Sequence, residues 1–270
     1  MHLDVRDLTK FTGSEIRAEV ATLLSSSVAA QVRALLVERG VLVFPKINMS
    51  DREQVAFAAL LGTVREEGQD GIFKVTLNKD NGPAADYLKG SFLWHLDGTH
   101  DKVPIFASLL SGRVLSAVGG ETEFASSYAA YEALTQTMKD RIADLTIIHS
   151  VEHSMLSAGV EAKPEYLASW RARPERAHKL VWTHQSGRKS LVVGCHAKEV
   201  IGMGKPESDA LIKELLDWIT QPRFVYRHHW SVGDLLIWDN TGVLHRAEPY
   251  PADSGRMMHR TTLVGAEAFN

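Results

Sequence analysis

Three residues that lie far apart in the sequence have side chains that could bind one metal ion. His95 and Asp97 form a His-x-Asp pair in the segment FLWHLDG, and His245 follows the apolar run LLIW much later in the chain. Alternate residues of a strand point to the same side, so the His95 imidazole and the Asp97 carboxylate can converge on one point. Two histidines and one carboxylate on one face of a metal, with three positions left open, form the facial triad of non-haem iron(II) oxygenases. We therefore predict His95, Asp97 and His245 as metal ligands.

The surroundings of the His-x-Asp pair matter, because the pattern alone is weak evidence for a metal. A second copy of it stands at residues 2–4, where a frayed chain end is a poor place for a metal site. The pair at residues 95–97 instead follows three apolar residues and precedes Gly98, which predicts a strand end beside a turn that opens to a pocket. Without this context, a surface hydrogen bond between His95 and Asp97 would be the ordinary interpretation.

Two arginines follow the distant histidine at a spacing that could place them together. Arg256 and Arg260 stand 11 and 15 residues after His245, in a segment, RMMHRTTLVG, that predicts a strand. A planar guanidinium donates two parallel hydrogen bonds to a carboxylate, so either arginine could fix an organic acid near the metal. The alternative for each is an ion pair with a neighbouring Asp or Glu.

The order and spacing of these motifs resemble the taurine dioxygenase and 2,4-dichlorophenoxyacetate dioxygenase (TauD/TfdA) family of Fe(II)- and 2-oxoglutarate-dependent oxygenases. The matching features are His95-x-Asp97, Thr122 in the segment GGET 27 residues after His95, His245 in WDNTGVLHRA, and then Arg256 and Arg260. The resemblance covers nearly the whole chain, from VLVFP to HRTTLVG, and it is specific because order and spacing agree together.

The resemblance implies a role for each of these residues. Thr122 and Arg256 would bind the distal carboxylate of 2-oxoglutarate, whose 2-oxo acid end would chelate Fe(II). Arg260 would anchor an anionic substrate headgroup, or else support Arg256 or a neighbouring acid. No catalytic residue beyond the metal ligands is expected, because the metal and its co-substrates, 2-oxoglutarate and O2, carry the oxidation. The carboxylate of Asp97 favours hydroxylation, since halogenation would require a small residue there.

The expected protein is thus a dioxygenase. It would hydroxylate an unactivated C–H bond of a small anionic substrate, a carboxylate or a sulfonate, and release succinate and CO2. Three alternatives stay open: the same chemistry on a larger natural-product scaffold, a non-oxidative hydrolase or isomerase that uses zinc in the same fold, and a non-catalytic binding module with a vestigial site. The intact set of ligands and Arg256 argues against the last.

The elements that must position these residues predict a fold that is mainly β with helices. Many short strands with regular turns favour a double-stranded β-helix (jelly-roll) core. We expect one catalytic domain over residues 1–270, with a lead-in of helices and a strand over 1–65. An insertion and lid within the jelly roll is expected over about 123–175, and a further lid segment over roughly 70–90.

Local signals define several elements more sharply. The segment from Val28 to Arg39 predicts a helix that ends at Gly40, and VLVF at 41–44 predicts a buried strand. Ser50 and the Glu three residues later form a capping box for the next helix. Residues 127–145 have apolar side chains at helical spacing, and the segments on either side of QSGRK predict a hairpin.

The composition excludes several classes of protein. The 270 residues have a net charge of −3, and the 30 Lys and Arg are spread along the chain, which argues against a nucleic-acid or membrane-surface partner. No apolar stretch reaches the roughly 20 residues needed to cross a bilayer. We therefore expect a soluble cytoplasmic enzyme with a small-molecule substrate. The resemblance implies a homo-oligomer, a dimer or a tetramer.

Overall fold

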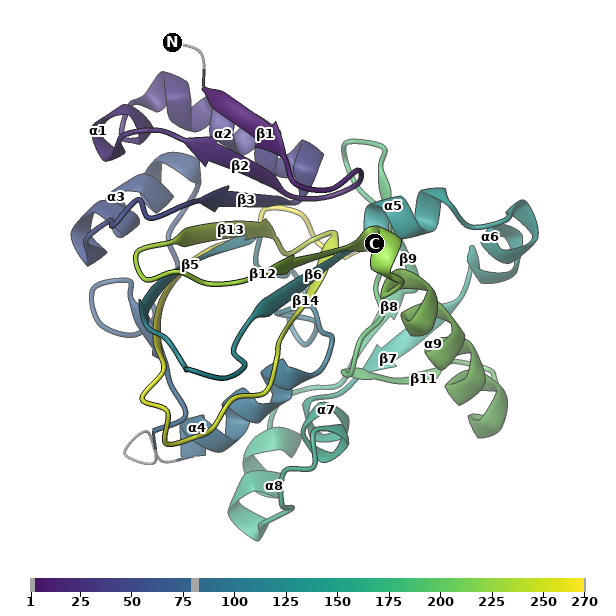
Figure 1. The fold of residues 1–270 in the computed structure, drawn as a ribbon. Coiled ribbons are helices and arrows are strands. Elements are labelled where there is room, and N and C mark those ends of the chain that lie inside the picture. Colours follow the sequence, from purple (N-terminus) through teal and green to yellow (C-terminus); the bar gives the residue numbers. More distant parts are fainter. Residues whose placement is uncertain (1–2, 79–82, 270) are drawn as a thin grey trace.

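The chain folds into a mixed α/β structure with several antiparallel sheets (Figure 1). The structure is a computed structural model, and it describes residues 3–78 and 83–269. Its largest sheet has seven strands, and the parallel pair within it is β2 with β3. In spatial order the strands are β1 (Asp4–Asp7), β2 (Ser14–Arg17), β3 (Val41–Phe44), β13 (Leu235–Asp239), β5 (Ala107–Val114), β15 (Met257–Leu263) and β4 (Phe73–Val75).

A second sheet packs against one face of the seven-stranded sheet. It consists of β12 (Val225–His228), β6 (Thr122–Ser126) and β14 (Val243–Ala247), with β6 in the middle. The alternation of side chains along β13 explains how the sheets meet. Leu236 and Trp238 point between the two sheets and pack with Phe124 of β6, whereas Leu235 and Ile237 point to the opposite face. Val243 of β14 is part of this core between the sheets, so the core supports the strand that carries His245.

Helices cover the other face of the large sheet, as the local signals predict. They are α1 (Val20–Leu23), α2 (Ser26–Arg39) and α3 (Asp51–Leu61). The predicted end of α2 at Gly40 is confirmed: this residue has a φ of 73°, and its N–H donates to the carbonyl of Leu36. The predicted strand at 41–44 and the Ser50–Glu53 capping box of α3 are also confirmed.

The segment that follows β6 builds a separate group of elements, at the right and bottom of Figure 1. The predicted helical run over 127–145 is two helices, because the Thr135 hydroxyl accepts from the Met138 N–H and begins a new one. The predicted hairpin around QSGRK is confirmed as β9 with β10. The helices are α5 (Ser127–Glu132), α6 (Gln136–Ile142), α7 (Val151–Ser157), α8 (Pro164–Arg171), α9 (Lys205–Ile219) and the 3₁₀ helix η3 (Pro222–Phe224); the strands are β7 (Thr146–His149), β8 (Arg176–Lys179), β9 (Val181–Thr183), β10 (Lys189–Leu191) and β11 (Ala197–Val200).

The segment that leads to His95 differs from the prediction. A strand end is expected there, but α4 (Pro83–Tyr87) and the 3₁₀ helix η2 (Leu88–Phe92) are followed by a loop. The strand-like feature of this loop is one isolated bridge, in which His95 pairs with His245. Residues 79–82 of the predicted lid, and residue 2 of the second His-x-Asp pair, lie outside the described residues.

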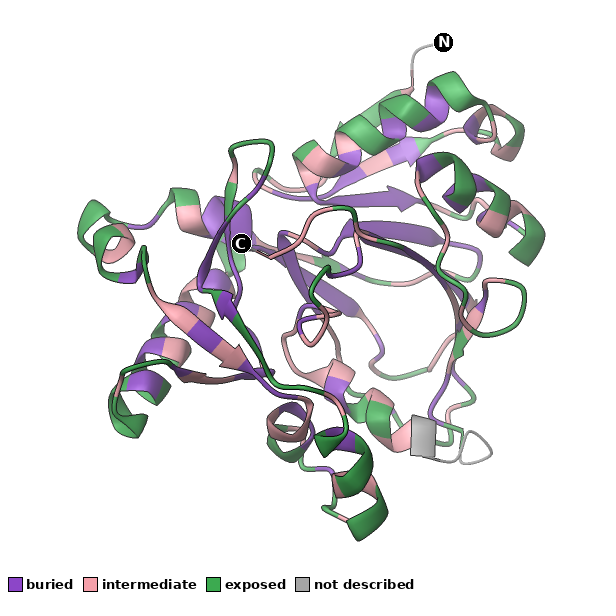
Figure 2. Cartoon of the chain, turned by 180° about the vertical axis from the view of Figure 1, so that it is seen from behind, coloured by how far each residue is buried: buried purple, intermediate pink, exposed green. Residues whose placement is uncertain are grey.

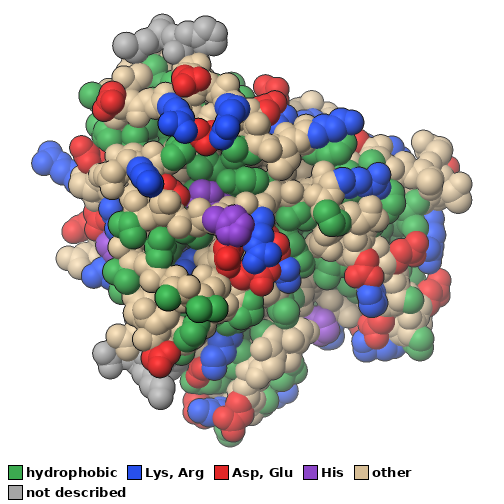
Figure 3. Space-filling view, viewed as in Figure 1, with side chains coloured by type: hydrophobic (Ala, Val, Ile, Leu, Met, Phe, Trp, Pro, Cys, Tyr) green, Lys and Arg blue, Asp and Glu red, His purple; other side chains and the backbone are tan. Residues whose placement is uncertain are grey.

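The distribution of buried and charged residues agrees with this arrangement of sheets and helices. The strands at the centre are buried and the outer faces of the helices are exposed (Figure 2). On the face shown in Figure 3, basic and acidic side chains are interspersed. Within residues 3–78 and 83–269, no helix combines the length and the apolar character that crossing a membrane requires.

Candidate metal centre

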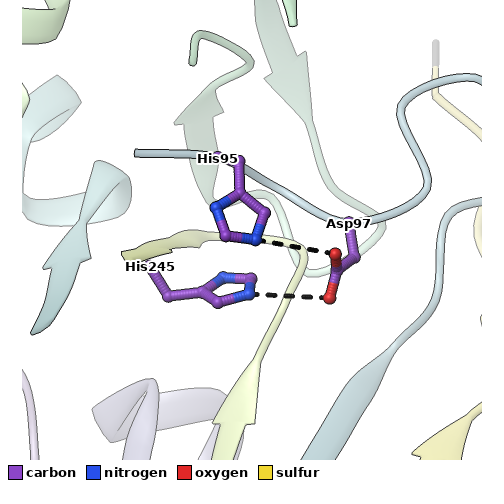
Figure 4. A group of neighbouring side chains, drawn as sticks. All are labelled: His95, Asp97 and His245. Carbon is purple, nitrogen blue, oxygen red and sulfur yellow. Dashed lines mark ion pairs between the residues drawn. The ribbon is translucent and has the colours of Figure 1, made fainter. Parts of the chain in front are cut away.

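The structure brings the three predicted ligands together (Figure 4). His95 and Asp97 come from the loop after η2, and His245 comes from β14, where the bridge holds the two histidines side by side. One ligand atom from each residue lies within 4.8 Å of the others. The Nε2 atoms of His95 and His245 are 3.7 and 3.5 Å from the two carboxylate oxygens of Asp97. Two imidazole nitrogens and one carboxylate oxygen therefore face one point.

The tautomer of His95 follows from the hydrogen bond of Nδ1, the ring nitrogen that faces away from Asp97. Nδ1 lies 2.7 Å from the carbonyl oxygen of Leu93, so Nδ1 carries the proton and donates it there. The lone pair of Nε2 is then free on the side of Asp97. Burial, together with the field of His245, lowers the pKa of His95 to about 4. The imidazole is thus neutral at physiological pH, which is the form that binds a metal.

Asp97 is held by its backbone rather than by its carboxylate. Its N–H donates to Oδ1 of Asn240 at 2.9 Å, and its carbonyl accepts from Nδ2 of the same residue at 2.8 Å. Burial raises the pKa of the Asp97 carboxyl, but the interactions with His245 and His95 lower that pKa by more, so the net shift is downward. The carboxylate is therefore ionised and free to bind.

The unpartnered polar atoms of this cluster fit a metal ion. Oδ2 of Asp97 is buried without a hydrogen-bond partner among the described residues. Buried polar groups are normally satisfied, so such an atom indicates a missing ligand or ion. A set of two histidines and one carboxylate suits a first-row divalent metal such as Fe(II) or Mn(II). The residues present therefore fit the metal that the sequence predicts.

A pocket of about 840 Å³ opens beside the cluster, and His95, Asp97 and Arg260 line it. Arg260 comes from β15, with its guanidinium 5.0 Å from the centre of the Phe73 ring. Its Nε atom is 3.5 Å from Oε1 of Glu67, which also accepts from the Thr262 hydroxyl. Arg260 therefore points into the pocket and contacts an acid there.

His100 also lines this pocket, with its Nε2 atom 3.8 Å from Oδ1 of Asp101. Burial lowers the pKa of the His100 imidazole.

Arg256 and Thr122 lie apart from the lining of this pocket. Both are 4% exposed. The Arg256 guanidinium donates to the carbonyl of Gly120 at 3.1 Å, two residues before Thr122, and packs on the Tyr250 ring. No carboxylate of the described residues forms an ion pair with it, and burial lowers its pKa. A buried cation without a counter-ion is costly, so this position is suited to an anionic ligand.

Two residues that hold this arrangement are not among those predicted from the sequence. Asn240 clamps the Asp97 backbone, and Nε1 of Trp230 donates to Oγ1 of Thr122 at 3.0 Å. Since the Trp230 N–H occupies one lone pair of that hydroxyl, the hydroxyl proton of Thr122 remains available to donate. The position of Asn240, five residues before His245 in WDNTGVLH, is a signal that could have found it.

Comparisons with known proteins agree with this geometry. Residues 4–262 match the family model described as taurine catabolism dioxygenase TauD, TfdA family. The (S)-phenoxypropionate/alpha-ketoglutarate-dioxygenase of Sphingobium herbicidovorans is 34% identical over 249 residues, which cover 88% of this chain and 86% of that protein. The alpha-ketoglutarate-dependent 2,4-dichlorophenoxyacetate dioxygenase of Burkholderia sp. (strain RASC) is 34% identical over 275 residues, 94% of this chain and 92% of that protein.

A solved structure agrees as well. The crystal structure of AAD-2 in complex with Mn(II) and N-oxalylglycine superposes with a TM-score of 0.86 at 33% identity, covering 100% of both chains. With the His-Asp-His cluster, these likenesses define the protein as a dioxygenase that depends on α-ketoglutarate, which is 2-oxoglutarate. The chain belongs to the TauD/TfdA family, as its motifs predict.

Proposed function

We propose that His95, Asp97 and His245 bind Fe(II), and that the enzyme hydroxylates an unactivated C–H bond of a small anionic organic substrate. The observation that carries this proposal is the convergence of the three ligand atoms within 4.8 Å at the wall of the pocket that also contains Arg260. Ferrous iron, when bound, supplies the activation of O2. Overall, substrate, 2-oxoglutarate and O2 give hydroxylated substrate, succinate and CO2.

Thr122 and Arg256 bind the distal carboxylate of 2-oxoglutarate in this proposal. The support is the buried guanidinium without a counter-ion and the Thr122 hydroxyl, whose proton is left free by the hydrogen bond from Trp230. An Arg–carboxylate pair is strong and directional when it is buried, so it would fix the register of the co-substrate. N-oxalylglycine, which AAD-2 binds in its crystal structure, carries the same two carboxylates as 2-oxoglutarate.

Arg260 anchors the anionic group of the substrate in this proposal. Its place in the pocket wall supports a contact with substrate over a role in holding Arg256. The ion pair of its Nε with Glu67 is the competing interaction that an anionic substrate would have to share. Two relatives are named for oxidising phenoxyalkanoic acids, which carry one carboxylate. We infer a carboxylate or sulfonate headgroup near Arg260 and an apolar body along the apolar part of the wall, which includes Phe73, Met155 and Trp170.

The same chemistry on a larger scaffold is a second candidate. A pocket of about 840 Å³ exceeds what a small acid needs and lies in the upper part of the range for drug-sized ligands. A screen for substrates should therefore include larger natural-product carboxylates.

We also propose how the chain is organised around this site. Residues 1–270 form one catalytic domain on a double-stranded β-helix core, with a lead-in over 1–65 and an insertion and lid over about 123–175. The packing of the β12-β6-β14 sheet against the seven-stranded sheet supports this description. We propose a homo-oligomer of two or four copies. The cytoplasm is the proposed compartment, since the single cysteine, Cys195, forms no internal disulfide.

The proposal is tested by succinate release from 2-oxoglutarate in the presence of Fe(II), ascorbate and a panel of carboxylates and sulfonates. We expect one or more acids to stimulate turnover in the wild type and Asp97→Ala to lose both turnover and metal binding. Arg260→Gln should raise the KM for the anionic substrate and leave the KM for 2-oxoglutarate unchanged. Metal binding by Asp97→Ala at wild-type affinity would show that the ligand set is wrong.

The matched control is Asp101→Ala. Asp101 lies on the same loop and lines the same pocket, but its carboxylate is outside the His-Asp-His cluster. We expect this variant to bind the metal as the wild type does. An equal loss of metal in both variants would mean that the loop had collapsed and that Asp97 has no special role.

A further inference from the structure

Three buried histidines lie behind the loop that carries Asp97, and none of them belongs to the proposed ligand set. His149, on β7, His178, on β8, and His196, just before β11, are 0%, 8% and 5% exposed. The centre of the His149 ring is 4.8 Å from that of His196 and 5.3 Å from that of His178.

Two of these histidines hold the main chain on either side of Asp97. The N–H of Leu96 donates to Nε2 of His196 at 3.1 Å. Nε2 of His178 lies 2.8 Å from the carbonyl oxygen of Thr99. Outside the single bridge at His95, the loop has no strand partner, so side chains satisfy the backbone that a sheet would otherwise pair.

These contacts determine where the imidazole protons lie. A backbone N–H can only donate, so Nε2 of His196 must accept and the proton of that ring lies on Nδ1. Nδ1 of His196 is 2.7 Å from Nδ1 of His149 and donates to it. The proton of His149 therefore lies on Nε2, which is buried without a partner among the described residues. Each assignment follows from the one before it.

The arrangement requires both rings to be neutral. A protonated His196 would present a second N–H to the N–H of Leu96, and a protonated His149 would present one to Nδ1–H of His196. Burial, which is the largest cause, lowers the pKa of His149 to about 3 and also lowers that of His196. An acceptor on His149 is thus what keeps Nε2 of His196 unprotonated and facing Leu96.

We infer that His149 and His196 are positioning residues for the metal centre: His149 fixes the tautomer of His196, which holds the Leu96 N–H and thereby sets the Asp97 carboxylate. This inference rests on the proposed ligand set, in which Asp97 binds the metal. It assigns no contact with substrate to either histidine. The Leu96 peptide directly precedes Asp97, so a change in its orientation moves the carboxylate relative to His95 and His245.

Two substitutions at His149 separate this role from simple packing. His149→Asn places an amide oxygen near the position of Nδ1 and keeps an acceptor, whereas His149→Phe fills the space and removes it. We expect the Phe variant to bind Co(II) about 10-fold or more weakly than the wild type, the usual effect of losing a partner that orients a ligand. The Asn variant should bind Co(II) nearly as the wild type does, and its Co(II) absorption bands should be unchanged.

Nitrogen-15 NMR of histidine-labelled, metal-free protein gives an independent measurement on the wild type. We expect His196 as the Nδ1–H tautomer and His149 as the Nε2–H tautomer at neutral pH. The opposite tautomer of His196, or a charged ring, would overturn the inference even if the Phe variant failed to fold.

The proposed function is controlled separately with Asp97→Ala. Loss of Co(II) in that variant but wild-type Co(II) affinity in both His149 variants would refute the positioning role alone. Wild-type Co(II) affinity in Asp97→Ala would refute the ligand set, and the tautomers would be unaffected.

Discussion

Replacing Arg256 should have opposite effects on two quantities: the stability of the free protein and its affinity for 2-oxoglutarate. The residue is 4% exposed, and its guanidinium donates to the carbonyl of Gly120 and packs on the Tyr250 ring. No carboxylate of the described residues pairs with it. Arg256→Met keeps the length of the side chain and removes the charge. A buried cation without a counter-ion costs free energy in the folded protein, and an apolar side chain of similar length removes that cost. We therefore expect the free variant to melt at the wild-type temperature or a few degrees above it.

The affinity of the variant for 2-oxoglutarate should be much lower than that of the wild type. In the variant, the distal carboxylate would be buried without its cation, and breaking a buried charged pair costs about 3–5 kcal/mol. That loss corresponds to an affinity weaker by roughly 10²-fold to several thousandfold. In thermal melts with Mn(II) and increasing 2-oxoglutarate, the wild type should gain stability with ligand concentration and the variant should gain none until far higher concentrations. The KM for 2-oxoglutarate in the succinate assay should rise in parallel.

Arg113→Met is the matched control. Arg113 is already paired, since it donates to Asp51 at 2.8 Å and to the carbonyl of Met49 at 2.7 Å. Its removal should lower the melting temperature and leave the affinity for 2-oxoglutarate unchanged. Wild-type affinity in Arg256→Met would refute the carboxylate site. A melting temperature several degrees lower in the free Arg256 variant would refute the claim that its charge is uncompensated.

Two further predictions concern stability. Gly98→Ala should unfold at a lower temperature than Gly187→Ala: both residues have a φ near 80°, but a Cβ at Gly98 would lie 3.2 Å from backbone atoms of Pro104 and Ile105, and one at Gly187 would meet nothing within 4 Å. Equal melting temperatures would contradict the packing part of this argument. The second prediction concerns pH. The pKa of His149 is lowered from 6.5 to about 3, so below pH 6.5 the unfolded chain binds a proton that the folded protein does not, and stability falls as the pH falls. In urea unfolding of metal-free protein, His149→Asn should lose less stability on acidification, by about 1.4 kcal/mol per pH unit. Parallel curves for the two proteins would contradict it.

The sequence by itself determined the family, the set of candidate ligands and several elements. Helix ends and caps, such as Gly40 and the Ser50–Glu53 box, depend on residues a few positions apart, so they can be read locally. The candidate ligands could be proposed because metal binding demands particular side chains, and the order of His95, Asp97, His245 and the two arginines is specific. Short motifs alone were insufficient, as the second His-x-Asp pair at residues 2–4 shows.

The strand predicted at His95 shows where secondary-structure prediction from neighbouring residues fails. The apolar residues before it resemble a strand, yet they form a 3₁₀ helix and a loop, and the pairing of His95 with β14 is a single bridge. His95 and Asp97 converge with His245 even though the strand that was expected to align them is a loop. Tertiary contacts, chiefly the hydrogen bonds of Asp97 to Asn240, hold the loop instead.

Only the tertiary structure decided which groups contact the residues and loops of the candidate site. Asn240, His196, Trp230 and Glu67 each act on a partner more than 90 positions away in the sequence, and a polar residue gives no local sign of such a partner. The same holds for the separation of Arg256 from Arg260: they are four residues apart, yet one is buried beside Gly120 and the other lines the pocket. Ligand chemistry is a property of side-chain type, whereas the geometry and protonation of the site depend on burial and on neighbours that only folding brings together.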